Sequence, residues 1–273
     1  MKLLGALGLA VLCAPGLAQN DNGGPFVDSH GRIWKVLPDP ADYPDFAAWD
    51  AEFAQELFTD VRGRSFQIDR ELTPEELFTA EAERRLNRFL RPQRGPGGSI
   101  RASVRTHHPG DEEWRAAYGS GWQSTISGIV ESADNAMHAN WGIDLVPNSY
   151  YTWDSKDSNT ISRLLDEAYA EGGGLAGQCM MIAYSADPTQ GSAIGIAYVG
   201  LPRALVKRYS NLEANITEHE VGHTYTLQHC CQVCTMRSVL SPSYFGIFHN
   251  SADSCSGQNH FSSMNAQKNR YCP

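Results

Sequence analysis

The 273-residue sequence has no long apolar run after its first eighteen residues, no excess of positive charge and only a moderate content of charged residues. A membrane-spanning helix needs about 20 predominantly apolar residues, so no span is expected beyond residue 18. The formal net charge of −9 at pH 7 argues against nucleic acid or an anionic membrane as the main partner. With 41% hydrophobic and 19% charged residues, the composition excludes a disordered chain and is typical of a globular protein.

Residues 1–18 are predicted to be a secretory signal peptide. Lys2 supplies the positive start, residues 3–13 form an apolar stretch, and residues 16–18 (Gly-Leu-Ala) give a small-x-small cleavage site. The apolar stretch is too short to cross a bilayer. The mature protein is therefore expected to begin near residue 19 and to be soluble and secreted.

An even number of cysteines remains once Cys13 is removed with the signal peptide. They are Cys179, Cys230, Cys231, Cys234, Cys255 and Cys272. In an oxidising compartment this predicts three disulfides, whose pairing the sequence does not determine. Cys231 and Cys234 also have the spacing of half a zinc knuckle or of a redox pair. No second such pair and no βαβ pattern accompany them, so a disulfide is the favoured interpretation.

Residues 19–98 are predicted to form a separate, helical N-terminal segment. Apolar residues recur at helical spacing over 45–58, and Thr73 followed by Pro74 has the signature of a helix start. Residues 91–98 are rich in Pro, Gly and Arg and read as a linker that proteases could cut. The segment is either a propeptide or a part that packs permanently on the rest of the chain.

Residues 99–273 have the pattern of a larger mixed α/β domain. Alternating and continuous apolar runs predict strands, and longer periodic runs predict helices. The expected order is a strand over 100–106, a helix over 111–140, a strand over 143–153, a helix over 161–170, strands over 179–184 and 192–199, and a helix over 211–228. Ser210 and Glu213 have capping-box spacing at the start of the last helix.

The most informative motif is residues 219–229, with the sequence His-Glu-Val-Gly-His-Thr-Tyr-Thr-Leu-Gln-His. His219 and His223 are four residues apart on a predicted helix, so they lie on one face and can bind one metal ion. His229 can join them only if the chain turns back after the helix. Three histidine ligands leave the fourth position of a tetrahedral zinc open, which is typical of a catalytic site. Glu220 is then placed to act as the general base.

This motif and the order of elements resemble the metzincin clan of zinc endopeptidases. The resemblance implies a zincin fold, with a twisted mixed sheet over an active-site helix and a small C-terminal subdomain, in a catalytic domain over 99–273. Residues 195–200 look like the substrate-lining edge strand of the adamalysin (reprolysin) group, and residues 229–236 resemble archaemetzincins. In the clan a glycine usually makes the turn before the third histidine. Here Thr226 stands there, which implies strain or a different turn, because left-handed backbone is costly for a residue with a Cβ.

Two further expectations come from the resemblance. A metzincin has a methionine-containing turn under the zinc, for which Met236 is favoured over Leu240. A zymogen needs a group that silences the metal, and no cysteine lies in residues 19–98. A thiol is therefore excluded for that role, whereas an aspartate or histidine of the segment could serve.

The sequence thus predicts a secreted zinc endopeptidase that acts on a protein or peptide substrate through zinc-activated water. The predicted metal ligands are His219, His223 and His229, with Glu220 as the catalytic base and one Zn²⁺ as the cofactor. The alternative is an inactive zinc-containing module that binds or inhibits a partner. Acidic groups at predicted helix starts could bind calcium, but no other feature supports this. Neither nucleic acid nor membrane is an expected partner, and the oligomeric state is left open.

Overall fold

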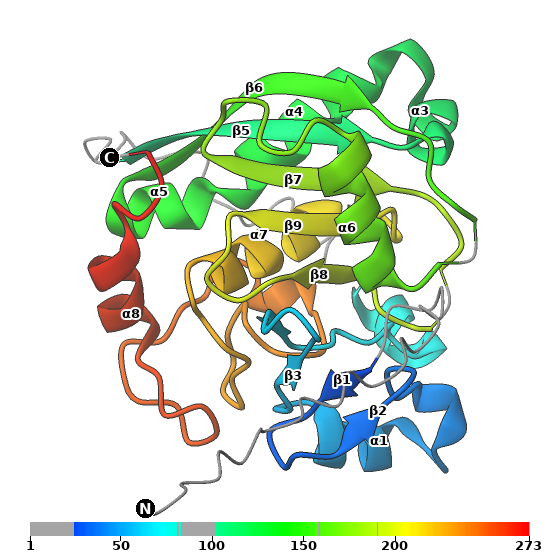
Figure 1. Cartoon of the computed structure of the whole chain (residues 1–273). Helices are drawn as coiled ribbons and strands as arrows, with labels where there is room; N and C mark the ends of the chain where they lie inside the picture. The colour runs from blue at the N-terminus through cyan, green and yellow to red at the C-terminus, as the bar shows by residue number, and fades with distance from the viewer. Residues whose placement is uncertain (1–24, 81, 83–101, 158, 190, 273) are drawn as a thin grey trace, which may run out of the picture.

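The computed structural model describes residues 25–80, 82, 102–157, 159–189 and 191–272. The predicted signal peptide and the predicted linker, together with the boundary between the two segments, lie outside the described residues. Figure 1 shows a large sheet with helices on both faces, and a smaller N-terminal assembly beside the β8 edge of that sheet.

A five-stranded mixed sheet is the frame of the larger part. Its strand order is β6-β5-β7-β9-β8, in which β8 runs antiparallel at one edge and the other four strands run parallel. The strands are β5 (Ala102–Gly110), β6 (Ile143–Thr152), β7 (Met180–Ser185), β8 (Gly195–Ala197) and β9 (Arg203–Lys207). This arrangement confirms the predicted mixed α/β fold class, and it places residues 195–197 at the edge, as expected.

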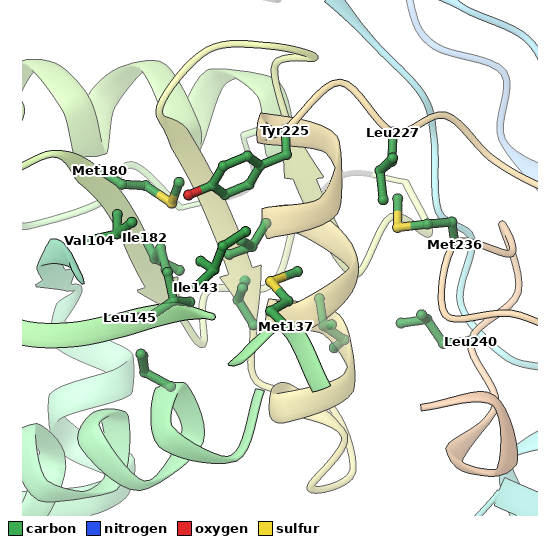
Figure 2. Packing of buried hydrophobic residues seen from close by; sticks show 14 of the residues in the cluster. Val104, Met137, Ile143, Leu145, Met180, Ile182, Tyr225, Leu227, Met236 and Leu240 are labelled. Carbon is green, nitrogen blue, oxygen red and sulfur yellow. The ribbon is translucent and has the colours of Figure 1, made fainter. Parts of the chain in front are cut away.

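Strand β7 is buried on both faces because helices cover both sides of the sheet. Met180, Ile182 and Tyr184 belong to one apolar cluster, and Met181 and Ala183 belong to the other. Such two-sided burial is typical of a central parallel strand. The first cluster includes residues of α4 (Trp122–Ala133), α5 (Asn135–Trp141) and α7 (Glu213–Thr224), and the second includes α6 (Ile161–Glu171). Figure 2 shows the first cluster packed against α7.

Two predictions about this part were wrong. The single helix expected over 111–140 is interrupted: α3 (Glu112–Tyr118) ends at Gly119, whose φ of 54° cannot continue a helix. A short 3-10 turn at Gly119–Gly121 then leads into α4. Strand β9 was not predicted. Its apolar core is only three residues long and is flanked by Arg203 and Lys207, so the sequence gives no clear strand signal there.

The described part of the N-terminal segment is less helical than predicted. Four two-residue strands form a second sheet in the order β2-β1-β3-β4: β1 (Phe26–Val27), β2 (Ile33–Trp34), β3 (Phe58–Thr59) and β4 (Ser65–Phe66). Strands this short carry no periodic signal. Among the described residues of the segment, the α-helices are α1 (Phe46–Phe53) and residues 74–80, and a 3-10 turn lies at Pro40–Asp42. The predicted start at Thr73 is confirmed, because Thr73 Oγ1 accepts from Glu76 N and Glu76 Oε2 accepts from Thr73 N.

The six cysteines form three disulfides that fasten the C-terminal third. The pairs are Cys179–Cys272, Cys230–Cys234 and Cys231–Cys255. The first joins the chain end after α8 (His260–Gln267) to the start of β7. Among the described residues, no helix has the length and apolar character that a membrane crossing needs.

Candidate metal centre

Helix α7 brings the first two histidines of the motif together. His219 and His223 are fully buried, lie one turn apart and have their Nε2 atoms 3.0 Å from each other. The helix begins at Glu213, and the predicted cap at Ser210 was wrong: the side chain of Glu213 instead accepts from the backbone of Tyr209. Ser210 has a φ of 49°, so it lies in a left-handed turn before the helix.

The turn that returns the chain toward the cluster is centred on Thr226. Helix α7 ends at Thr224, and Thr226 has a φ of 73°, the left-handed conformation that glycine adopts freely. Thr226 N donates to His223 O, and Thr226 O accepts from the side chain of Gln258. The backbone of this turn therefore has the conformation that is typical of glycine, and the Cβ of Thr226 makes that conformation strained.

Replacing Thr226 by glycine is expected to raise the free energy of unfolding by about 0.5–1 kcal/mol. Left-handed backbone costs a residue with a Cβ about 1–2 kcal/mol, and the greater freedom of glycine in the unfolded chain offsets about 0.5–1 kcal/mol of that gain. Denaturant unfolding measures the difference. Thr226→Ala is the matched control, because it keeps the Cβ and should gain much less. Equal stabilisation by alanine and glycine would show that the backbone conformation is not the source of strain.

The three histidine rings of the motif are all held by backbone carbonyls. Each Nδ1 lies at hydrogen-bonding distance from one carbonyl oxygen: His219 from Thr235 at 2.8 Å, His223 from Leu227 at 2.7 Å and His229 from Ala54 at 2.7 Å. A carbonyl can only accept, so each Nδ1 is the donor, and in a neutral ring Nε2 then presents a lone pair. Carbonyl partners of this kind fix the orientation of metal-binding histidines in proteins.

The three Nε2 atoms converge on one point. That of His219 is 3.0 Å from that of His223 and 3.3 Å from that of His229. Lone pairs that face one another at this range repel unless a cation lies between them. Tetrahedral zinc, with Zn–N bonds of about 2.0–2.1 Å, places its ligand atoms about 3.3 Å apart. The spacing and the donor set therefore fit a zinc ion.

Glu220 lies between the helix and the edge strand. Its side chain is fully buried, and neither carboxylate oxygen has a hydrogen-bond partner among the described residues. A Cβ on Gly195 of β8 would collide with this carboxylate, so the glycine leaves the space that Glu220 fills. Burial and the nearby carboxylate of Asp69 raise the pKa of Glu220. A buried carboxylate with no structural partner beside a metal centre is a candidate for proton transfer.

Met236 packs under α7 at the level of the histidines. Its thioether fills the space where a Cβ of Gly222 would stand, and its side chain lies beside Leu227 (Figure 2). Leu240 is also buried but lies farther along, away from Leu227 (Figure 2). Of the two candidates for the methionine position, Met236 is thus the one in contact with the helix that carries the histidines.

Comparison with known proteins identifies the family. Residues 104–272, more than half of the chain, match the family model described as Metallo-peptidase family M12. The chain belongs to metallopeptidase family M12. Among solved structures, archaemetzincin from Methanopyrus kandleri is similar to it, with 14% sequence identity, a TM-score of 0.41 and coverage of 62% of this chain and 96% of that chain. No curated protein matches the sequence.

Membership of family M12 confirms the predicted resemblance to metzincin zinc metalloproteases. It indicates a zinc-dependent peptidase, with protein or peptide substrates, as the general function. The match includes the whole 219–229 motif and the edge strand β8.

In this M12 peptidase, a carboxylate from outside the matched residues also lies at the histidine cluster. Asp69 Oδ1 is 3.1 Å from His219 Nε2 and 2.9 Å from His229 Nε2, and the side chain is fully buried. No motif surrounds Asp69 in the sequence, and it lies 150 residues before the first histidine. Asp69 is thus one of the aspartates and histidines of residues 19–98 that the sequence offered, without distinguishing among them, as a group to silence the metal.

Two other histidines of the M12 peptidase have structural partners instead. His107 and His108 lie in β5, which extends past the strand predicted over 100–106. His107 Nδ1 is 2.7 Å from Ser149 Oγ on the neighbouring strand, and His108 Nδ1 is 3.1 Å from the carbonyl of Ile182. Burial lowers the pKa of His108 to about 3, so this ring is neutral at neutral pH. Both rings connect adjacent strands.

Proposed function

We propose that the chain is a secreted zinc endopeptidase in which His219, His223 and His229 hold one catalytic zinc ion and Glu220 is the general base. The observation that carries the proposal is the convergence of three Nε2 lone pairs on one point, with an unpartnered buried carboxylate beside it. A site of three histidines leaves a coordination position for water or substrate. Secretion is supported by the signal-type sequence of residues 1–18 and by the three disulfides, which need an oxidising compartment.

The chemistry that zinc supplies in such a site is Lewis acidity, which makes water acidic near neutral pH and polarises a carbonyl. Glu220 would accept a proton from the attacking water at a carboxylate oxygen and then deliver it to the leaving amine nitrogen. The carbonyl contacts of His219 and His223 keep these two rings fixed during these steps.

Substrate is proposed to bind along the edge strand β8. An edge strand has free backbone groups, and an extended peptide can pair with them. In the structure residues 65–71 already bond to the residues that flank β8, with an antiparallel bridge between Arg70 and Ala193: Val199 N donates to Ser65 O, Ile194 N donates to Asp69 O and Glu71 N donates to Ser192 O, at 2.7, 3.2 and 2.6 Å. This pairing supports an extended, antiparallel mode of substrate binding.

The alternative, an inactive module that binds or inhibits a partner, has less support. Burying a carboxylate without a partner costs stability, and a purely structural site would gain nothing from Glu220. The strained turn at Thr226 still delivers His229 to the cluster, so it does not disable the metal centre.

The test is cleavage of denatured casein by the purified chain after limited trypsin treatment, which should remove residues 65–71 from the edge strand. We expect cleavage that a zinc chelator abolishes and that added zinc restores, whereas added calcium does not. A trypsin-treated chain that contains zinc but cleaves neither casein nor gelatin would overturn the proposal in favour of the binding module. Trypsin alone, inhibited after the treatment, is the blank.

A further inference from the structure

We propose that Gln258 is a positioning residue of the metal centre, because its side-chain amide holds the turn between the second and third histidine ligands. The inference rests on the proposed function of the same site. It assigns a role to the loop of residues 253–258, which precedes α8 and contains none of the proposed ligands. In this role Gln258 acts through the backbone of the turn, and not as a ligand or a base.

The amide of Gln258 bonds to the turn at two points, one on each side of Leu227. Its Nε2 donates to Thr226 O at 3.0 Å, and its Oε1 accepts from Gln228 N at 2.9 Å. The orientation of the amide follows from these partners, because a backbone carbonyl only accepts and a backbone N–H only donates. One planar group makes both bonds, so it fixes the backbone that lies between them.

The backbone between the two bonds orients one ligand and leads to the next. Leu227 O accepts from His223 Nδ1 at 2.7 Å, which leaves the Nε2 atom of this ring facing that of His219. Two residues after Leu227, the ring of His229 enters the cluster. A shift of Leu227 would therefore reorient one ring and displace the other. Partners of this kind tune the metal affinity of the histidines that they orient.

The strained backbone of Thr226 explains why the turn needs this support. Thr226 has a φ of 73°, a conformation that is unfavourable for a residue with a Cβ. The start of the turn is closed by backbone hydrogen bonds from Thr226 N and Leu227 N to carbonyls of α7. The amide of Gln258 bonds on the other side, where the chain leaves the turn toward the third histidine. It thus holds the strained conformation from the side that the helix does not reach.

The loop of residues 253–258 is itself fastened to the chain just after the third histidine. Cys255 forms a disulfide with Cys231, and the buried carboxylate of Asp253 accepts from Cys231 N at 3.1 Å. Within the loop, Asp253 N donates to Gln258 O at 2.8 Å. The loop is therefore anchored on one side of the third ligand, and its amide holds the turn on the other side.

The first measurement is the zinc affinity of the intact chain, from competition with a chelator of known affinity. Gln258→Ala should weaken zinc binding about 10-fold, the low end of the effect of losing groups that orient metal-binding histidines. The matched control is Gln232→Ala, which truncates another glutamine close to the third histidine. Its side chain donates to Ala252 O at 3.5 Å and not to the turn. The control should bind zinc as tightly as the wild type does.

Gln258→Glu tests whether the amide itself is needed. The glutamate has nearly the same size and keeps an acceptor for Gln228 N, but an oxygen replaces the donor that faces Thr226 O. Two acceptors that face each other repel, so this variant should weaken zinc binding at least as much as Gln258→Ala does. Wild-type affinity in Gln258→Glu would overturn the proposal.

The Thr226→Gly background separates positioning of the ligands from a general loss of stability. Glycine adopts the left-handed conformation without strain, so Gln258→Ala should weaken zinc binding less than about 3-fold there, as expected for two residues in contact whose effects are coupled. A merely structural role would leave the ratio of affinities the same in both backgrounds. If Gln258→Ala does not fold but Thr226→Gly/Gln258→Ala folds and binds zinc, support of the strained turn is shown directly.

The outcomes distinguish this inference from the proposed function. If the wild type and Gln258→Ala bind one zinc ion with the same affinity, Gln258 is not a positioning residue, while the peptidase proposal stands. If neither protein binds zinc, the metal centre itself falls, and this inference falls with it. Equal weakening in the threonine and glycine backgrounds, or equal weakening by Gln232→Ala, would overturn the role of the amide in holding the turn.

Discussion

Glu220→Gln is expected to lower the kcat for casein cleavage by about 10²–10⁴-fold, the usual contribution of a positioned general base, while the zinc content stays at one ion per chain. The amide has nearly the same size as the carboxylate, so it fits the space beside Gly195 without collision. It cannot accept the proton of the attacking water. The measurement is kcat on the trypsin-treated chain together with metal analysis of the same sample.

Glu218→Gln is the matched control for this prediction. Glu218 is two residues away on the same helix and is equally buried, but its Oε2 accepts from Thr235 Oγ1 and Gly246 N. Its replacement should lower stability and leave kcat close to the wild-type value. If Glu220→Gln retains substantial kcat, or if both variants lose it equally, Glu220 is not the general base.

Removal of zinc is expected to lower the free energy of unfolding by about 4 kcal/mol when free zinc stands near a thousandfold over the Kd. In the chain without metal, three buried rings present converging lone pairs and Asp69 adds a buried charge. These groups repel one another once the zinc ion no longer lies between them, so the folded state is less stable. For a domain of this size the loss corresponds to a fall in Tm of about 10 °C. Thermal unfolding with and without chelator measures it.

His223→Ala provides the control for the stability measurement. This variant lacks one of the proposed ligands, so chelator should shift its Tm little. A chelator-induced shift of the same size in His223→Ala would mean that the ion stabilises the fold from another place. No shift in the wild type would remove the support for a metal bound at the histidines.

Local sequence signals predicted most of the catalytic half of the fold. The central strand at Met180–Ser185 and the helix that carries His219 and His223 follow from apolar periodicity, which depends only on neighbouring residues. The return of the chain to His229 followed from the spacing of the motif. For Thr226 the chemistry of a β-branched residue predicted either strain or a different turn, and its φ of 73° shows that the turn keeps the left-handed conformation, which is the strained alternative.

What the sequence could not reveal depends on contacts between distant segments. Asp69 reaches the histidines, and Ala54 O reaches His229, only because residues 65–71 pair with the edge of a sheet formed more than a hundred residues later. The pairing of Cys179 with Cys272 likewise needs the fold. The two-residue strands of the N-terminal sheet are too short for any periodic signal, so the segment was predicted to be helical.

The zinc content of the purified full-length chain tests the central claim most directly, because it does not depend on release of the N-terminal segment. Metal analysis after exhaustive dialysis should give one zinc ion per wild-type chain and none for a His219→Ala/His223→Ala double variant. A folded wild-type chain that contains no zinc after refolding in its presence, or a double variant that keeps its ion, would contradict the account.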